Sequence, residues 1–230
     1  MIEFPKNWNI IGRPIVLGDI EERMICVLKQ LDCKNLSLSG GVDSSLLLYF
    51  MVQAFGTDVC CYTAAGSEEH PDYIHANLVA RHFGVDCIAY IIPYSFSFPK
   101  TGDEIVKAFY KHLISKLEVD RIVVGDGIDE FMGGYYHHAN NPTEEMYYYY
   151  LRRLQKDQFQ PLNETSGSVK VLLPYMDEEL LSMFIQIPLS ERFDSGNRKK
   201  IVYQMAEGRL PSSIIERRKY GFCDAMRIKK

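Results

Sequence analysis

The chain has 230 residues, of which 47% are hydrophobic and 24% are charged, which suits one sizeable soluble domain. Its formal net charge of −4 gives no reason to expect a nucleic acid or a membrane as the partner. No secretion signal and no membrane-spanning apolar run is recognised, so we expect a cytoplasmic protein. The 6 cysteines contain no C-x-x-C pair, which predicts free buried thiols rather than a metal site.

The first half of the chain predicts strands that alternate with helices. Apolar spacing predicts a helix over Asp19 to Leu31, followed by the short strand "NLSLS", a glycine break and an apolar helix over Ser44 to Phe55. Further strands are predicted over residues 59–65, 85–92 and 121–127, and further helices over residues 71–84 and 102–118. This alternation implies an α/β fold with a mainly parallel, doubly wound sheet and helices on both faces.

The pattern changes at Tyr135. The next stretch has no strand signal and ends in a polar, loop-like segment at Ser168, whereas residues 177–188 and 198–211 are typical of helices that stop near a proline. We therefore expect a nucleotide-binding α/β domain over residues 1–135 and a helical C-terminal section over residues 136–230 that completes the active site.

Two strands of the predicted sheet end in polar segments rich in glycine. The first strand is followed by "SGGVDSS" from Ser39, and the fourth by "GDGIDE" from Gly125. Glycines let the backbone approach a phosphate, and Asp43 and Asp129 could share a magnesium ion with phosphate oxygens. Each segment alone is equally compatible with a helix cap or a turn, but two in one crevice favour a phosphate site. Neither segment has the spacing of a Walker A loop or a dinucleotide fingerprint.

These motifs resemble a known family. "SGGVDSS" matches the pyrophosphate-binding loop of the PP-loop ATP pyrophosphatases, and "GDGIDEFMGGY" is similar to a signature of asparagine synthetases and the related β-lactam synthetases. Three later segments follow in the order of that family: "LPYMDEELL" from residue 173, "RKKIVYQMAEGRLP" from residue 198 and "RRKYGF" from residue 217. The resemblance covers almost the whole chain.

The resemblance implies a ligase that uses ATP and magnesium to adenylate a carboxylate. Pyrophosphate leaves, and ammonia or an amine then attacks the acyl-adenylate to form an amide and AMP. The implied site residues are Ser39, Gly40, Gly41, Asp43, Ser44, Ser45, Gly125 and Lys199 for ATP and pyrophosphate, Asp43 and Asp129 for magnesium, and Lys219 and Asp126 for catalysis. Lys219 would stabilise the transition state, and Asp126 would act as a general base or orient the amine. By residue type alone, Lys219 would belong to a solvated basic cluster with Arg217 and Arg218.

Some positions depart from the family pattern. Asparagine synthetases begin with a glutaminase domain whose nucleophile is an N-terminal cysteine, but here residue 2 is Ile2 and no cysteine precedes Cys26. We therefore expect the nitrogen to come from free ammonia, from an amine, or from a separate glutaminase subunit. Leu172 and Tyr203 stand where the family often has arginine, which argues against aspartate as the substrate. The oligomeric state stays open, with a homodimer among the options.

Two other functions are compatible with a PP-loop sequence. A tRNA-modifying enzyme would favour paired reactive cysteines or a basic face, and the sequence shows neither. A non-catalytic, nucleotide-binding subunit of a glutamine amidotransferase complex would not need Asp43, Asp129 and Lys219. The run Tyr147 to Tyr150 could line an aromatic acceptor pocket, although packing of an amphipathic helix is the simpler explanation.

Overall fold

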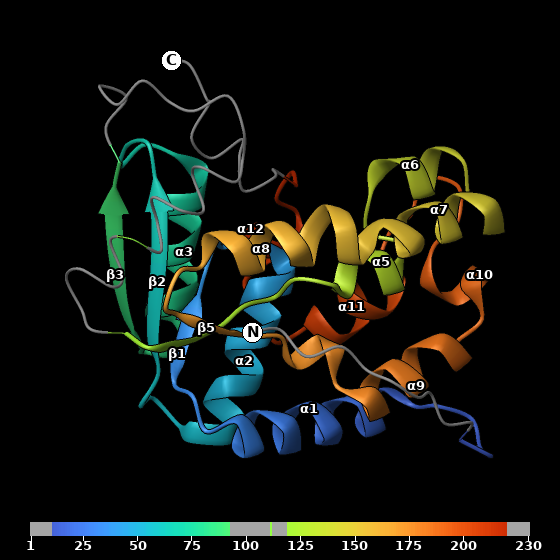
Figure 1. The fold of residues 1–230 in the computed structure, drawn as a ribbon, viewed down its shortest axis with the longest axis horizontal. Coiled ribbons are helices and arrows are strands. Elements are labelled where there is room, and N and C mark those ends of the chain that lie inside the picture. The colour runs from blue at the N-terminus through green and yellow to red at the C-terminus, as the bar shows by residue number, and fades with distance from the viewer. Residues whose placement is uncertain (1–10, 93–110, 112–118, 220–230) are drawn as a thin grey trace.

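The computed structural model describes residues 11–92, 111 and 119–219, and its strands form one parallel five-stranded sheet (Figure 1). In chain order the strands are β1 (Asn35–Ser37), β2 (Cys60–Ala65), β3 (Asp86–Ile91), β4 (Arg121–Val123) and β5 (Lys170–Leu172). They lie side by side in the order β3-β2-β1-β4-β5, and every neighbouring pair is parallel. The predicted α/β class with a mainly parallel, doubly wound sheet is confirmed.

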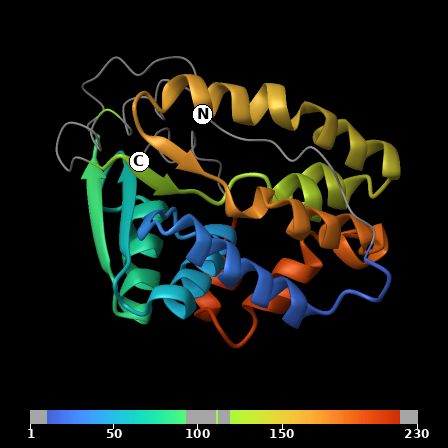
Figure 2. The same ribbon diagram turned by 60° about the horizontal axis from the view of Figure 1, so that its bottom comes forward.

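Helices cover both faces of this sheet, with α1 and α2 on one side and α8 on the other (Figure 2). The α-helices are α1 (Leu17–Leu31), α2 (Val42–Phe55), α3 (Pro71–Phe83), α5 (Ile128–Met132), α6 (Tyr136–Asn140), α7 (Glu144–Leu154), α8 (Gln160–Thr165), α9 (Glu178–Gln186), α10 (Leu189–Arg192), α11 (Lys200–Ala206) and α12 (Ser212–Ile215). A π-helical turn, η1 (Gln155–Phe159), joins α7 to α8, and a 3-10 turn, η2 (Pro174–Met176), precedes α9.

The predicted elements of the first half agree with the structure to within a few residues at their ends. The helix expected over residues 102–118 lies outside the described residues. Two expectations for the later part of the chain are wrong. The polar stretch expected to be loop-like is helical. It continues α7 through η1 and α8 and ends at Thr165. A strand, β5, lies where only helices were expected, because its three residues acquire their extended shape by pairing with β4.

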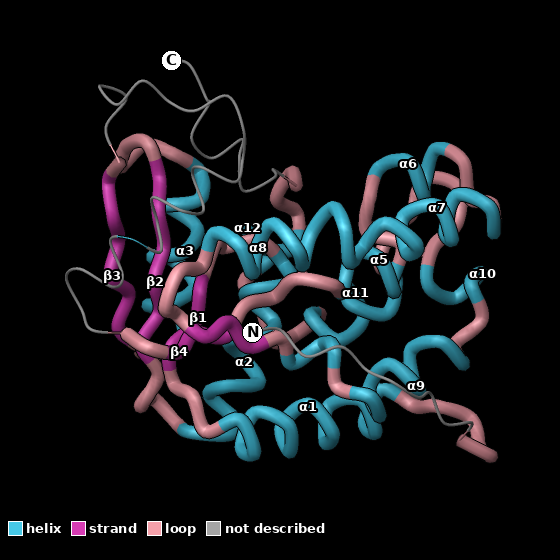
Figure 3. Tube along the Cα trace, in the orientation of Figure 1, coloured by secondary structure: helices cyan, strands magenta, loops and turns pink. Residues whose placement is uncertain are grey.

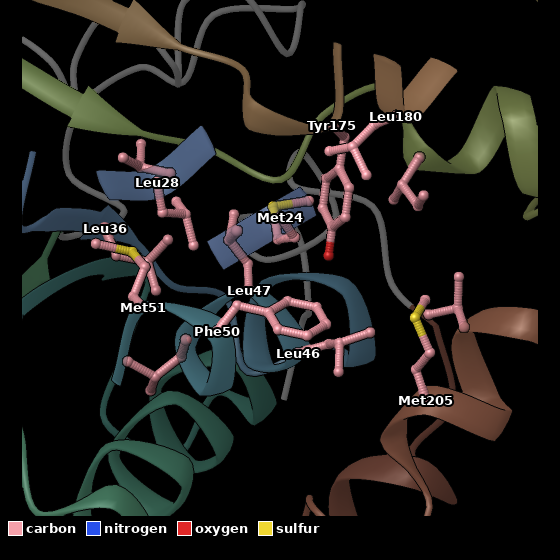
Figure 4. Packing of buried hydrophobic residues seen from close by; sticks show 14 of the residues in the cluster. Met24, Leu28, Leu36, Leu46, Leu47, Phe50, Met51, Tyr175, Leu180 and Met205 are labelled. Atoms are coloured by element: carbon pink, nitrogen blue, oxygen red, sulfur yellow. The ribbon is translucent and has the colours of Figure 1, made fainter. Parts of the chain in front are cut away.

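Side chains of the strands alternate between two apolar layers. Val123 and Leu172 face the layer beneath α1, α2 and α3, whereas Ile122 and Val171 face the layer that α8 covers through Leu162. This period of two is what a sheet covered on both faces requires. The larger layer surrounds α2, which is apolar on nearly all sides (Figure 4). Its burial anchors the loop that precedes it.

The strand order reverses between β1 and β4. From β1 the chain adds β2 and β3 on one side and then crosses to place β4 on the other side, with Leu36 paired to Val123 (Figure 3). In open parallel sheets this switch point leaves a crevice at the carboxyl ends of the two strands, where ligands bind. The two glycine-rich segments are therefore brought to one place.

Two further expectations can be compared with the structure. In the described ranges, no helix is both long enough and apolar enough to cross a membrane. The five described cysteines are free thiols, as predicted. Cys33 and Cys61 are buried as predicted, whereas Cys60 and Cys87 are half-buried. Cys26 is exposed, because it lies on the outer face of the amphipathic helix α1.

Candidate active site

The loop between β1 and α2 is held by its own serine side chains. The Ser39 backbone N–H donates to Ser44 Oγ at 3.3 Å, and the two hydroxyl oxygens lie 3.2 Å apart. Gly40 has a left-handed φ of 68°, and a Cβ there would collide with the backbone of α3. The Gly41 N–H donates weakly to Ser39 Oγ at 3.4 Å. The loop therefore requires glycine where α3 approaches it.

Asp43 does not cap α2. The helix begins one residue before it, after Gly41, and no side chain caps its first N–H groups. Asp43 instead lies in the first turn, where a negative charge is favoured by the helix dipole. Ser45 lies deeper. Its Oγ is buried and has no hydrogen-bond partner among the described residues, so it faces the core side of the loop.

The loop after β4 contacts the loop after β1. A Cβ on Gly125 would lie 3.7 Å from the backbone N and Cα of Ser44, so only ordinary van der Waals space separates the two segments. Gly127 has a φ of 96°, and a Cβ there would collide with the side chain of Met176. The short helix α5 begins directly after Gly127, which places Asp129 in its first turn.

Lys199 joins the aspartates of the two loops. Its side chain is 2% exposed, its Nζ is paired with Asp43 Oδ2, and it lies 2.5 Å from Asp129 Oδ1. The chain makes room for this contact at Gly134, where a Cβ would overlap the Asp129 carboxylate and the Lys199 side chain. Lys199 was expected to contact ATP. In the structure its partners are the two carboxylates expected to bind magnesium.

Lys219 approaches Asp129 from the other side. Its Nζ is paired with Asp129 Oδ2 and lies 5.1 Å from the centre of the Tyr135 ring. Arg217 fastens the segment that carries Lys219, because its guanidinium pairs with Asp72 of α3 and donates to the Ser39 carbonyl at 2.8 Å.

The alternative of a solvated basic cluster does not hold for Arg217. The Arg217 and Asp72 side chains are only 6% and 4% exposed, whereas Arg218 is exposed. The segment with Lys219 is thus tied to the β1 loop by a buried ion pair rather than by surface charges. Lys219 itself lies between these extremes and contacts the site.

The charges of this cluster stabilise one another. Burial raises the pKa of Asp129, but Lys199 and Lys219 outweigh it and hold that pKa well below its usual range. Burial disfavours the charged form of Lys199, yet Asp129 and Asp43 outweigh burial and raise its pKa. Burial and the neighbouring Lys199 lower the pKa of Lys219. The site therefore holds ionised Asp129 and Lys199 near neutral pH.

Asp126 and Glu130 have raised pKa values. Removal of the carboxylate from water and the negative charges of Asp129 and Asp43 raise the pKa of Asp126 to about 6. Because Asp126 is an exposed residue, its carboxylate loses only part of its water, and the upward direction of its pKa shift rests on the charges of Asp129 and Asp43. Burial and the charge of Asp129 raise the pKa of Glu130 to about 7. Groups that titrate in this range suit proton transfer near neutral pH.

The two aspartates are suitable ligands for a hard divalent cation. Asp43 Oδ1 is buried and has no hydrogen-bond partner among the described residues, which leaves one carboxylate oxygen for a metal ion. No group of three or more His, Cys, Asp or Glu in the described parts could hold a metal ion. As hard oxygen ligands, Asp43 and Asp129 would suit an ion such as Mg²⁺, with Asp43 offering its free Oδ1 and Asp129 releasing a lysine that now pairs with it.

Three contributors to the site were missed in the sequence. Asp72 carried no signal, because an acidic residue in the first turn of a helix is ordinary. Tyr175 donates its hydroxyl to the Asp43 carbonyl at 3.2 Å, and Gly134 admits Lys199. Both stand inside the quoted segments "LPYMDEELL" and "GDGIDEFMGGY", so the motifs pointed to them without indicating what they contact.

This geometry can be compared with known proteins. The sequence matches the asparagine synthase family over residues 35–166 and 137–229, which together include both loops and both lysines. The chain belongs to the asparagine synthase family. It is 24% identical over 220 residues to a probable glutamine-hydrolyzing asparagine synthetase of Acanthamoeba polyphaga mimivirus. That alignment covers 84% of this chain and 40% of the viral protein, so the chain spans well under half of this relative.

A solved structure of low sequence identity shares the fold. The NMN synthetase of Francisella tularensis has a TM-score of 0.50 and 11% identity, and the match covers 88% of this chain and 75% of that one. An ammonia-dependent NAD synthetase of Campylobacter jejuni has a TM-score of 0.41 and 13% identity, with 65% and 78% covered. The first match supports the PP-loop fold and says nothing of this chain's substrate.

Proposed function

We propose that this member of the asparagine synthase family is an ATP-dependent ligase that adenylates a carboxylate and forms an amide, with AMP and pyrophosphate as products. One observation carries the proposal. Asp43 and Asp129, from the loops after β1 and β4, converge with Lys199 and Lys219 at the switch point of the sheet. This arrangement offers carboxylates for a metal ion and cations for phosphate charge, next to a helix N-terminus.

Each part has a role in the first step. The β1 loop would bind pyrophosphate through backbone N–H groups, Ser39 and Ser44, and Asp43 and Asp129 would hold a magnesium ion. When bound, that ion supplies charge neutralisation to the phosphates. A carboxylate oxygen of the substrate attacks the α-phosphorus, and the bond from that phosphorus to pyrophosphate breaks. Lys219 would stabilise the charge that develops, because its ammonium already lies at this carboxylate pair.

The second step needs a nitrogen nucleophile in its neutral form. Asp126 would accept a proton from the amine or orient it, since its pKa of about 6 leaves it ionised at neutral pH. The viral relative is named as a glutamine-hydrolyzing enzyme, and this chain aligns with 40% of it. We propose that this chain uses ammonia or an amine directly, or receives ammonia from a separate glutaminase subunit.

The proposal is tested by ATP–pyrophosphate exchange with Mg²⁺ and a panel of carboxylates. We expect exchange with some of them, and a loss of about 100-fold or more in Asp43→Ala and Lys219→Ala, the magnitude for a group that stabilises transition-state charge. Arg218→Ala removes an exposed cation next to Lys219 and should keep the rate. No exchange with any carboxylate, together with unchanged nucleotide binding in the two variants, would refute the ligase.

A further inference from the structure

A small pocket lies beside the cluster of aspartates and lysines, between α5, the N-terminus of α6 and the continuous helical segment formed by α7 and η1. Its volume is about 160 Å³. Cavities of about 150 Å³ accommodate a benzene ring, so the pocket has room for a six-membered ring. The lining residues are Glu130, Tyr135, Tyr149, Tyr150, Arg153, Leu154, Asp157 and Gln158.

The walls of this pocket are largely aromatic. The Tyr135 and Tyr150 rings are stacked, with centroids 4.3 Å apart and planes at 22°. Tyr149 stands edge-on to Tyr150, with a centroid distance of 5.2 Å. Tyrosine rings bind flat apolar groups by stacking and attract cations to their faces. The tyrosine run is thus more than the packing face of a helix, since two of its members line a cavity.

The polar groups in the lining favour an amine over an anion. Arg153, the one cation among the described lining residues, is already engaged, because its Nε lies 2.5 Å from Asp157 and it donates to the Tyr149 hydroxyl at 2.8 Å. Glu130 is 3% exposed and accepts a hydrogen bond from the Tyr135 hydroxyl, and no described lysine or arginine forms a salt bridge with it. An amine or ammonium would find a hydrogen-bond acceptor in the Glu130 carboxyl group, whereas a carboxylate ligand would find no unoccupied cation among the described lining residues.

The pocket shares residues with the reaction site. Glu130 directly follows Asp129 in α5. Tyr135, which forms part of the pocket, also has the Lys219 ammonium 5.1 Å from its ring centre. A nucleophile held by Glu130 and the tyrosine rings is therefore adjacent to the group proposed to act on the acyl-adenylate.

We infer that this pocket is the subsite for the nitrogen nucleophile, and that the nucleophile is a primary amine on a flat or apolar body of about six heavy atoms rather than ammonia. The inference rests on the proposed ligase function. The bound ammonium loses one proton to Asp126 or to water, and its nitrogen attacks the acyl carbon. The bond between that carbon and the AMP oxygen breaks with the electron pair on oxygen, and the new amide nitrogen releases its second proton to water.

Ligand-observed NMR with benzylamine and benzoate tests the pocket independently of adenylation. We expect the wild-type protein to bind benzylamine and not benzoate. Binding should weaken at least tenfold in Glu130→Gln, which replaces an acceptor oxygen by a donating NH₂ group at nearly constant shape, and in Tyr150→Leu, which removes one wall of the pocket. Tyr148→Leu is the matched control, because Tyr148 is 39% exposed on the same helix and does not line the pocket.

The outcomes distinguish a failure of the pocket assignment from a failure of the proposed ligase function. Benzoate binding as well as benzylamine, no benzylamine binding, or equal binding by all variants would overturn the pocket assignment and leave the ligase to the exchange assay. Benzylamine binding without any pyrophosphate exchange would overturn the ligase and with it the role as a nucleophile subsite. Since the wild-type protein alone distinguishes the two probes, a variant that fails to fold does not remove the test; circular dichroism of each variant detects that failure.

Discussion

Replacing Lys199 by methionine tests whether one buried ammonium holds the two loops together. Lys199 is 2% exposed and contacts Asp43 and Asp129, whose side chains are each 20% exposed. In Lys199→Met, Asp129 retains its ion pair with Lys219, but Asp43 loses its ion pair with Lys199. Removal of one partner from a buried ion pair typically costs about 3–5 kcal/mol, because the remaining charge is left uncompensated. We expect a loss of this size in the free energy of unfolding at pH 7.

Urea unfolding followed by circular dichroism measures the change. Lys200→Met is the matched control, since this neighbouring lysine forms a more exposed pair with Asp194 at 2.7 Å and should cost about 1 kcal/mol or less. A second arm uses the double variant Asp43→Asn with Lys199→Met. It removes the unpaired charge and should be more stable than Lys199→Met by about 1 kcal/mol or more.

The reasoning would be refuted by either of two results. A loss in Lys199→Met no larger than that in Lys200→Met would show that the ammonium does not lie buried between the carboxylates. A double variant less stable than the single variant would show that Asp43 is stabilised by something other than Lys199. Both measurements concern the unfolding free energy and need no substrate.

Two further predictions concern residues outside the reacting cluster. Arg217→Met should lower the unfolding free energy by about 3–5 kcal/mol, because it leaves the buried Asp72 carboxylate unpaired. Arg218→Met, at an exposed residue, should change the unfolding free energy by about 0.5 kcal/mol or less. Urea titration measures both variants, and equal losses would contradict the buried pair. His138 is fully buried, and burial lowers its pKa to about 4 in the folded protein. In the unfolded chain the His138 imidazole is protonated as the pH falls below about 6.5, whereas in the folded protein it stays neutral, so acid favours the unfolded state. From pH 7 to pH 5 this residue should remove about 2 kcal/mol of stability, and His138→Asn should show a correspondingly smaller pH dependence in the same titration.

Much of the fold could be predicted because its signals are local. The alternation of apolar strands with helices predicted the doubly wound sheet, since side-chain periodicity depends on neighbours a few residues away. β5 escaped detection because three residues carry too little periodicity, and it becomes a strand by pairing with β4. The helical continuation to Thr165 was missed because polar residues were interpreted as a loop, although α7 extends directly into it through η1.

In the candidate site, too, local features could be predicted from the sequence and contacts between distant residues could not. Gly40 and Asp43 could be singled out from the sequence because a strand, a glycine break and a helix place them at a strand end. The pairing of Lys199 with Asp43 joins residues 156 positions apart, and that of Arg217 with Asp72 joins residues 145 positions apart.

By itself, the sequence determined the strand-and-helix order and the two loops at the carboxyl ends of β1 and β4, because turn chemistry and periodicity are properties of short segments. The tertiary structure decided which cation meets which carboxylate, that Arg217 is buried, and that tyrosines of α7 form a pocket with Glu130. Those contacts depend on how separate elements pack against each other, and such packing energies come from surfaces that no short segment contains.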